Sequence, residues 1–572
     1  MSASQTVSST PEWVARSNEN ASVMLDVIGR FAPEQASFLG VAGLDDRVTD
    51  LGPDVTRRFV EAMQKAVETL RGKIASEKHA AIRQDLEIMV KRGELSIAGS
   101  QLGERLLLPY YNLNETIFQG LRALLDDQVP QERRRVGLAR LSRYAGLGAG
   151  ETPPAKLAED RIREKLGNAS LVGPFRGEVD KDFANSGPLL RGAQDLFRKY
   201  EITGFEAAYA ELSKQLDAYW KFVQEQVVPR CRPDFRLPPE VYANNIERIG
   251  IDMPIAELTG RARAAFREIQ NEMQSLANLV AKERGFKTSG YREVLAELKK
   301  KQIVGEEILP HYEHRIRQLE ILIRDHDVIT LPDRPMQIRL ASEAESAAIP
   351  APNMRPPRMI GNTGELGTFV LPLRIPGEPG KQQLQFDDFT FDAASWTLTA
   401  HEGRPGHELQ FAAMVETGVS IARAIFAMNS TNVEGWALYA EAEMKPYEPL
   451  EGQLSALQHR LLRSARAFLD PGLQDGSITR DEAMRVLRED VVLSEAMATQ
   501  EVERYTFWAP AQAPSYFCGY QRLLEIRTDA ERALGPRFHR LKYHDFLLAQ
   551  GLLPPSLLRK AVFEEFVPSQ KA

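Results

Sequence analysis

The sequence has little of what several protein classes require. Its 572 residues include two cysteines, Cys231 and Cys518, which are too few for a disulfide framework or a cysteine zinc site. It contains no run of about 18 apolar residues, the length that a transmembrane helix needs. Positive charge is not in excess, since 72 Lys and Arg stand against 79 Asp and Glu. We therefore expect neither a membrane nor a nucleic acid as a partner.

The start of the chain and its length bear on location and domain organisation. Residues 1–6 show neither a basic segment nor an apolar segment of the secretory type, so we expect a cytoplasmic protein. A chain of this length exceeds one core of about 250–300 residues. The proline-rich, aperiodic segment 229–239 is the best candidate boundary. We predict an N-terminal helical lobe over 1–232 and a second lobe over 233–572. The sequence leaves a homodimer open.

Apolar residues recur mostly at intervals of three and four, which is the period of an amphipathic helix. This pattern covers about 10–232, 255–324 and 392–566. Two short segments, 336–341 and 367–373, alternate or run apolar and predict strands. The sequence therefore predicts a mainly α-helical protein of two lobes with one small β-sheet.

Two histidines lie in an unusual local motif, which runs from His401-Glu402 to His407. In a zinc-binding His-Glu helix the two histidines are four residues apart and share one face. A spacing of six places them about 120° apart on an ideal helix, which is too far to share an ion. The residues that can break the helix between them are Gly403, Pro405 and Gly406. A bulge there would bring the two side chains together.

A second helix, predicted over 430–443, carries acidic residues among small and apolar ones. Glu434 and Glu441 are seven residues apart, hence about 20° apart on one face. A carboxylate on an apolar face is costly unless it is paired or bound to a metal. Glu434 is thus the candidate third ligand, and the alternative is an ion pair with Arg423 or Arg463. Glu441 is better suited to a supporting position or to the surface.

Together, the two motifs resemble the bacterial domain-of-unknown-function 885 family, which is grouped with zinc-dependent peptidases of the His-Glu type. The resemblance extends to both ends of the chain, through segments 33–40, 45–47, 510–512, 516–519 and 544–551. It implies a two-lobed helical zinc-peptidase-like fold, with the strands beside the His-Glu helix. It implies a hydrolase site more firmly than it implies a substrate.

One position departs from the family pattern. Members usually carry a second histidine after His407, where this chain has Glu408. If that second histidine were the ligand, the metal site would be altered or lost. Glu408 could support a ligand, replace it as an oxygen donor, or be a solvated helix residue.

The resemblance and the motif together lead to a mechanistic hypothesis. We expect one Zn²⁺, held by His401, His407 and Glu434, with water in the open fourth position that distinguishes a catalytic site. The metal would acidify that water, and Glu402 would take its proton and pass it to the leaving amine. The expected reaction is amide hydrolysis.

Three residues of the C-terminal helices are candidates for contact with the substrate. Tyr516 and His544 could stabilise the oxyanion, as Tyr and His do in related zinc peptidases, or could simply form hydrogen bonds in the core. Arg527 could fix a terminal carboxylate or form a structural salt bridge. We expect short peptides or small acyl compounds as substrates. The alternatives are a tailoring hydrolase of a non-peptide amide or ester, and a metal-free binding or scaffold protein with a degenerate site, which Glu408 favours.

Overall fold

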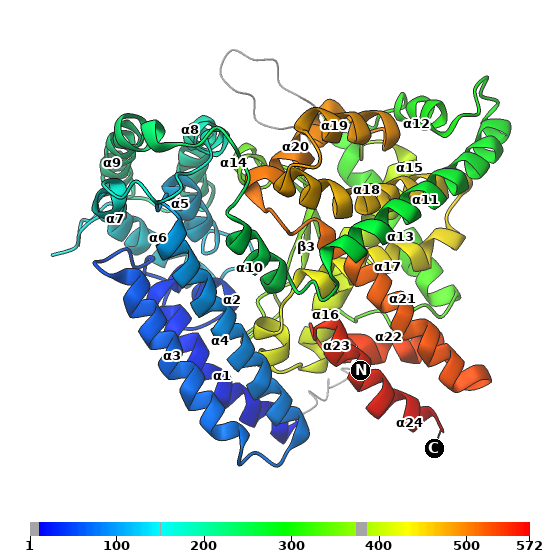
Figure 1. Ribbon diagram of the computed structural model, residues 1–572, viewed down its shortest axis with the longest axis horizontal. Coiled ribbons are helices and arrows are strands. Elements are labelled where there is room, and N and C mark those ends of the chain that lie inside the picture. Colours follow the sequence, from blue (N-terminus) through cyan, green and yellow to red (C-terminus); the bar gives the residue numbers. More distant parts are fainter. Residues whose placement is uncertain (1–10, 149, 373–385, 572) are drawn as a thin grey trace.

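A computed structural model of the protein describes residues 11–148, 150–372 and 386–571. Helices dominate it (Figure 1), so the predicted mainly α-helical class is confirmed. The helices before the predicted boundary are α1 (Glu12–Phe31), α2 (Pro33–Leu39), α3 (Val55–Ile74), α4 (Ala80–Leu106), α5 (Leu113–Arg122), α6 (Gln131–Tyr144), α7 (Pro154–Leu166), α8 (Arg176–Lys199) and α9 (Glu206–Phe222).

The rest of the chain is helical as well, apart from one small sheet. Its helices up to the middle of the second lobe are α10 (Pro239–Ile249), α11 (Ile255–Arg284), α12 (Tyr291–Lys299), α13 (Ile308–Asp325), α14 (Glu343–Ala348), α15 (Asp392–Glu402), α16 (His407–Thr417) and α17 (Ser430–Met444). They are followed by α18 (Leu450–Asp475), α19 (Arg480–Arg485), α20 (Glu495–Glu503), α21 (Pro514–Leu534), α22 (Arg540–Ala549), α23 (Pro555–Ala561) and α24 (Val567–Lys571).

Most of the helices form where the apolar period predicts them, as α3 illustrates, whereas α10 and α14 lie outside the predicted segments. Its buried residues are Met63, Ala66, Val67 and Leu70. Intervals of three, one and three residues place all of them on one side of a helix, and exposed residues such as Gln64 and Glu68 occupy the other side. Among the described helices, none is long and apolar enough to cross a membrane.

The sheet has three short strands in the order β1-β3-β2. β1 (Gln337–Leu340) pairs parallel to β3 (Thr368–Leu371), in the two segments predicted as strands. Residue 373, the last of the second predicted segment, lies outside the described residues. β2 (Asn353–Arg355) pairs antiparallel to β3 and was not predicted, because its segment is rich in proline and glycine.

The sheet packs beside the helix that carries the His-Glu pair. Phe369 of β3 is fully buried and belongs to one hydrophobic cluster with Tyr312 of α13 and Leu398 of α15. The rings of Tyr312 and Phe369 are 5.7 Å apart and meet edge to face. This contact holds β3 against α13 and α15.

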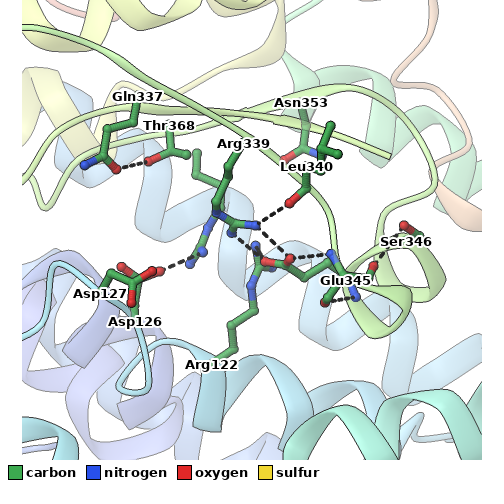
Figure 2. A network of polar contacts seen from close by, with 12 residues as sticks. Arg122, Asp126, Asp127, Gln337, Arg339, Leu340, Glu345, Ser346, Asn353 and Thr368 are labelled. Carbon is green, nitrogen blue, oxygen red and sulfur yellow. Dashed lines mark hydrogen bonds and ion pairs between the residues drawn. The ribbon is translucent and has the colours of Figure 1, made fainter. Parts of the chain in front are cut away.

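A network of ion pairs ties the other side of the sheet to the N-terminal helices (Figure 2). Glu345 of α14 accepts hydrogen bonds from Arg339 of β1 at 2.6 and 2.8 Å and from the backbone nitrogen of Ser342 at 2.9 Å. Arg122 of α5 lies 2.5 Å from the same carboxylate. The carboxylate therefore joins α14 and the neighbouring strand β1 to α5, which is distant from both in sequence.

The predicted boundary at residue 232 divides part of the hydrophobic core but not all of it. One cluster lies wholly after the boundary, among residues 251–518, and another lies before it, among residues 51–227, apart from Ala344, Ala347 and Ala348. One large cluster combines buried residues 21–90, from α1, α3 and α4, with buried residues from α13, α15–α17 and α21–α24. A buried ion pair crosses the same junction, with Arg423 at 2.9 Å from Asp85 of α4. Figure 1 shows α10 between the blue N-terminal helices and the orange and red C-terminal ones. The two predicted lobes thus pack on each other through a shared core.

Candidate metal centre

The chain turns sharply between the two histidines of the motif. α15 ends at Glu402 and α16 begins at His407, so the helix is broken between them. Gly406 packs against the end of α15 so closely that a Cβ there would lie 2.0 Å from the carbonyl oxygen of His401. Only glycine fits this approach. The indole nitrogen of Trp436 in α17 donates to the Pro405 carbonyl at 3.0 Å and ties the turn to that helix.

Helices α17 and α21 meet backbone to backbone. A Cβ on Gly519 would lie 1.9 Å from the Thr431 carbonyl oxygen, and one on Gly435 would lie 2.6 Å from the Gly519 Cα. Neither position accommodates a side chain without a shift of backbone. This close crossing brings the neighbourhoods of Glu434 and Tyr516, which are far apart in sequence, to one place.

The turn and the helix crossing bring together the three predicted ligands. The imidazole rings of His401 and His407 are 4.7 Å apart. The Oε2 atom of Glu434 lies 3.3 Å from Nε2 of His407 and 3.7 Å from Nε2 of His401. One ligand atom from each residue falls within 4.8 Å of the others. Two imidazole nitrogens and a carboxylate oxygen form a donor set of the kind that binds zinc.

The cluster also contains polar atoms that the described protein leaves without partners. Oε2 of Glu434 and Nδ1 of His407 are buried and have no hydrogen-bond partner among the described residues. Such atoms are costly in a protein interior. The predicted alternative, an ion pair of Glu434 with Arg423 or Arg463, is not what the structure shows, because these arginines pair with Asp85 and Glu441. The residues present therefore fit a metal ion better than a closed ion pair.

Glu441 supports the first histidine. Its Oε1 lies 2.7 Å from Nδ1 of His401, and its Oε2 accepts a hydrogen bond from Thr397 at 2.5 Å. Because a carboxylate accepts, Nδ1 carries the proton and the lone pair of Nε2 faces the cluster. Burial raises the pKa of Glu441, but Arg463 and His401 outweigh it and bring that pKa to about 2. The carboxylate that orients His401 is therefore ionised.

Glu402 follows the first histidine and is 7% exposed. Burial raises its pKa to about 7, although His407 acts in the opposite direction. A carboxylate with a raised pKa beside candidate metal ligands is suited to accept and release a proton.

Tyr516 reaches the cluster from α21. Its ring stacks on that of His401, with centroids 6.1 Å apart and planes inclined by 12°. Its hydroxyl accepts a hydrogen bond from Arg504 at 2.8 Å, and the guanidinium carbon of Arg466 lies 4.4 Å from the ring centroid. Burial raises the pKa of Tyr516, so its proton stays on the oxygen.

Two residues of this site were not assigned a role from the sequence. Arg504, in the helical turn Arg504–Trp508, had no local signal at all. Gln512 belongs to a segment that resembles the family, but a glutamine has no charge to mark it. Its side-chain nitrogen donates to Oε1 of Glu434 at 3.2 Å and to Ser430 at 2.9 Å.

The structure places His544 and Arg527 in a separate polar group around Tyr439, and not among the three clustered residues. Nε2 of His544 and the guanidinium of Arg527 each lie 2.8 Å from the Tyr439 hydroxyl. Nδ1 of His544 is 2.7 Å from the Val328 carbonyl, and Arg527 also pairs with Glu443. The geometry of α17 explains why these two residues lie away from the cluster.

Glu443 is nine residues from Glu434 and therefore on the opposite face of α17. Glu441, seven residues from Glu434, shares its face. The polar group around Tyr439 and Glu443 thus belongs to the far side of the helix from the candidate metal centre.

Glu408 also points away from the cluster. It is fully buried, and Arg404 donates to it at 2.7 Å while pairing with Glu320 at 2.8 Å. Because it is buried, it is not a solvated residue. It is not placed as a replacement ligand either, because one step along the helix from His407 rotates the side chain by about 100°. The departure from the family pattern leaves the three clustered residues intact.

Two neighbouring cavities lie between the N-terminal helices and the candidate metal centre. The larger, of about 680 Å³, and the smaller, of about 290 Å³, share Asn245, Ala509 and Pro510 in their walls. The smaller one is also lined by Ser430 and Gln512. Gln512 contacts Glu434, and Ser430 precedes Glu434 by one helical turn. Neither cavity is lined by the clustered side chains themselves, so Gln512 and Ser430 separate the cavities from the cluster.

Comparisons with known proteins identify a family and a fold. A family model described as "Bacterial protein of unknown function (DUF885)" matches residues 33–562. A "putative lipoprotein" from Colwellia psychrerythraea is similar at a TM-score of 0.77 and 18% identity, covering 97% of this chain and 99% of that one. A "putative lipoprotein of unknown function" from Shewanella oneidensis reaches 0.71 and 17%, covering 96% and 100%. At these identities the likeness shows a shared fold.

Two further results add no functional assignment. A "putative oligoendopeptidase F" from Bacillus anthracis str. Ames gives a TM-score of 0.29 at 12% identity, covering 90% of this chain and 96% of that one. That score is too low to indicate a shared fold. A search of curated proteins found no match.

Proposed function

The chain belongs to the DUF885 family, and from the cluster in its core we propose that it is a zinc-dependent hydrolase that cleaves the amide bonds of short peptides. The observation that carries the proposal is the convergence of His401, His407 and Glu434 on one point, with ligand atoms within 4.8 Å of one another. One of the proposed ligand atoms, Oε2 of Glu434, is buried and lacks a hydrogen-bond partner in the described protein. Glu441 orients His401 as a supporting carboxylate does in zinc sites.

The proposed ligands are Nε2 of His401, Nε2 of His407 and the carboxylate of Glu434. When bound there, a zinc ion supplies Lewis-acid catalysis and lowers the pKa of water toward about 7. Side chains of the chain itself carry out the proton transfer and stabilise the carbonyl oxygen of the substrate.

Glu402 is the proposed proton carrier. Its carboxylate accepts a proton from the attacking water and delivers it to the nitrogen of the leaving amine. Burial favours the neutral form of this side chain and so favours the capture of that proton. Because Glu402 adjoins His401 in sequence, the proton is taken up beside the metal ligands.

Tyr516 is the proposed donor to the carbonyl oxygen of the substrate. Its hydroxyl already accepts a hydrogen bond from Arg504, which leaves its own proton free to be donated. The positive charges of Arg504 and Arg466 beside the ring of Tyr516 favour negative charge on the carbonyl oxygen of the substrate. Developing negative charge on the substrate would therefore be stabilised at this end of the site.

The position and volume of the two cavities favour short and flexible substrates. They lie between the two parts of the chain, and the larger measures about 680 Å³, which suits a peptide of a few residues and not a folded protein. The alternative of a degenerate, metal-free site was motivated by Glu408, and the ion pair of Glu408 with Arg404 outside the cluster favours the metal-binding proposal over it.

The test combines metal analysis with activity. We expect about one zinc per chain in the wild type, none in His401→Ala, and full zinc with activity reduced by about 10²–10⁴-fold in Glu402→Gln. His314→Ala, which changes an exposed histidine of α13, is the matched control and should keep both. Activity is read by mass spectrometry on a library of di- to hexapeptides with and without chelator.

Several outcomes would contradict the proposal. Undiminished zinc in His401→Ala would remove the ligand assignment, and a fully active Glu402→Gln would remove the proton carrier. Chelator-sensitive cleavage of native albumin, or of esters and non-peptide amides but no peptide, would overturn the substrate class.

A further inference from the structure

The smaller cavity beside the candidate metal centre has a strongly positive wall. Arg92 of α4 and Arg248 of α10 both line it. No aspartate or glutamate of the described chain is among its lining residues. Arg92 is half-buried and Arg248 is exposed, so the two guanidinium groups stand at the junction of the N-terminal helices with α10.

Neither arginine has an acidic partner within the described ranges. The carboxylates next to them in sequence pair with other residues: Glu94 with Arg71 at 2.5 Å, and Glu247 with Lys91 at 2.5 Å. The junction of α4 and α10 is therefore left with two cations that no carboxylate of the described chain neutralises.

The two charges also act on each other. The pKa of Arg92 is lowered, first because burial removes the side chain from water and then because the charge of Arg248 lies close to it. Like charges held together in a partly buried wall are unfavourable until an anion lies between them. An anionic ligand would relieve this repulsion.

The cavity is adjacent to the cluster of His401, His407 and Glu434. Gln512 lines the cavity and donates to Oε1 of Glu434 at 3.2 Å. Ser430 lines it too, and it precedes Glu434 by one turn of α17, on the same side of the helix. A ligand that fills the cavity therefore ends against Gln512, which contacts a proposed metal ligand.

We propose that this cavity binds the free carboxylate of the substrate, with Arg92 and Arg248 as the residues that recognise it. The inference rests on the proposed function and narrows it to peptides that present a carboxylate close to the bond that is cut. Arginine suits this role because its planar guanidinium matches a carboxylate and keeps its charge. In this proposal Arg92 and Arg248 take the role of carboxylate partner that the sequence suggested for Arg527. The structure places Arg527 in another polar group.

The experiment compares trialanine with its C-terminal amide, a pair that differs only in the carboxylate. Binding is measured by calorimetry on the zinc-loaded Glu402→Gln protein, which does not consume the ligand. The amide should bind at least tenfold more weakly than the acid. Adding Arg92→Gln and Arg248→Gln should abolish this preference by weakening the acid alone. Arg267→Gln, which removes an exposed arginine of α11 outside the cavity, is the control and should leave the preference intact.

Kinetics provide the second measurement, in protein that retains Glu402. The double arginine variant should raise KM for the acid at least tenfold with little change in kcat, and should leave both constants for the amide unchanged. A purely structural role of the arginines would instead affect acid and amide alike.

The outcomes separate this inference from the proposed function. Equal binding of acid and amide by the unmodified cavity, or a preference that survives both arginine changes, overturns the inference even if peptides are cleaved. A preference that depends on the two arginines, in a protein that cleaves no peptide, supports the cavity and overturns the proposed function.

Discussion

Glu345 and Glu434 are both removed from most of their water, and both have a pKa below the ordinary value. For Glu345, burial raises the pKa, but hydrogen bonds from Arg339 and the charge of Arg122 lower it further than burial raises it. For Glu434, burial again raises the pKa, while His401 and His407 lower it well below its usual range. The two carboxylates are thus alike in charge and differ in what surrounds them.

The difference lies in how the oxygens are used. Both oxygens of Glu345 accept bonds from arginine or backbone (Figure 2). Glu434 accepts one bond from Gln512, and its other oxygen faces two histidines without a hydrogen bond from any described residue. A saturated carboxylate stabilises the fold, whereas an unsaturated one keeps bonding capacity for a ligand. Burial and a shifted pKa therefore do not by themselves identify a functional acid.

The largest expected effect is on stability, in Glu345→Gln. The change leaves the buried Arg122 and the partly exposed Arg339 without their counter-charge, and breaking a buried pair such as that of Arg122 costs about 3–5 kcal/mol. Urea unfolding measures the loss, and zinc content should not change. Glu343→Gln on the same helix is the control, because its side chain is 66% exposed and an exposed pair contributes no more than about 1 kcal/mol. Loss of zinc together with stability would break the distinction between the two sites.

Glu434→Gln should show the reverse pattern. Since loss of a supporting carboxylate already weakens zinc sites by 10–100-fold, removal of a ligand should weaken binding by at least about 100-fold, or ~2.7 kcal/mol. Competition with a chromophoric chelator measures this affinity. In chelator-treated protein the free energy of unfolding should change less than in Glu345→Gln. Zinc affinity equal to the wild type would show that Glu434 is not a ligand.

Glu441→Gln should have a smaller effect on the same affinity. The variant keeps its shape but no longer holds His401 with a charged acceptor, and a loss of about 10–100-fold is expected. Glu443→Gln is the matched control on the opposite face of α17 and should leave zinc affinity unaltered. Equal losses in both variants would mean that the effect comes from the helix as a whole.

The smallest expected effect is a pH dependence of the Glu345 contribution. Its folded-state pKa is lowered, so the stabilisation is complete above the unfolded-state value of about 4.3 and declines as pH falls toward the folded-state value. The stability difference between wild type and Glu345→Gln should narrow below about pH 4.3, by at most about 1.4 kcal/mol per pH unit. Urea unfolding at pH 7, 4 and 3 measures it. A difference that stays constant over this range would show that charge is not its cause.

Local patterns in the sequence were enough for most of the helices, for two of the three strands and for the proximity of His401, His407 and Glu434. These features depend on spacing along one segment, such as the apolar period of α3 or the glycines that interrupt the His-Glu motif. β2 was missed because three residues flanked by proline and glycine carry no period. The boundary predicted at residue 232 rests on the proline-rich segment, whereas the core that the two sides share leaves no mark in composition.

The sequence by itself determined which residues could bind a metal, because ligand chemistry and helical spacing are local properties. Only the tertiary structure decided which C-terminal residues join them. Tyr516 reaches His401 because Gly435 and Gly519 let two helices touch, while His544 and Arg527 lie on the far face of α17. Charge neutralisation is likewise a property of the assembled fold, so no pattern in the sequence distinguishes the unpaired Arg92 and Arg248 from paired arginines. Contacts between segments that are distant in sequence depend on how the helices cross, and that is settled only when the core packs.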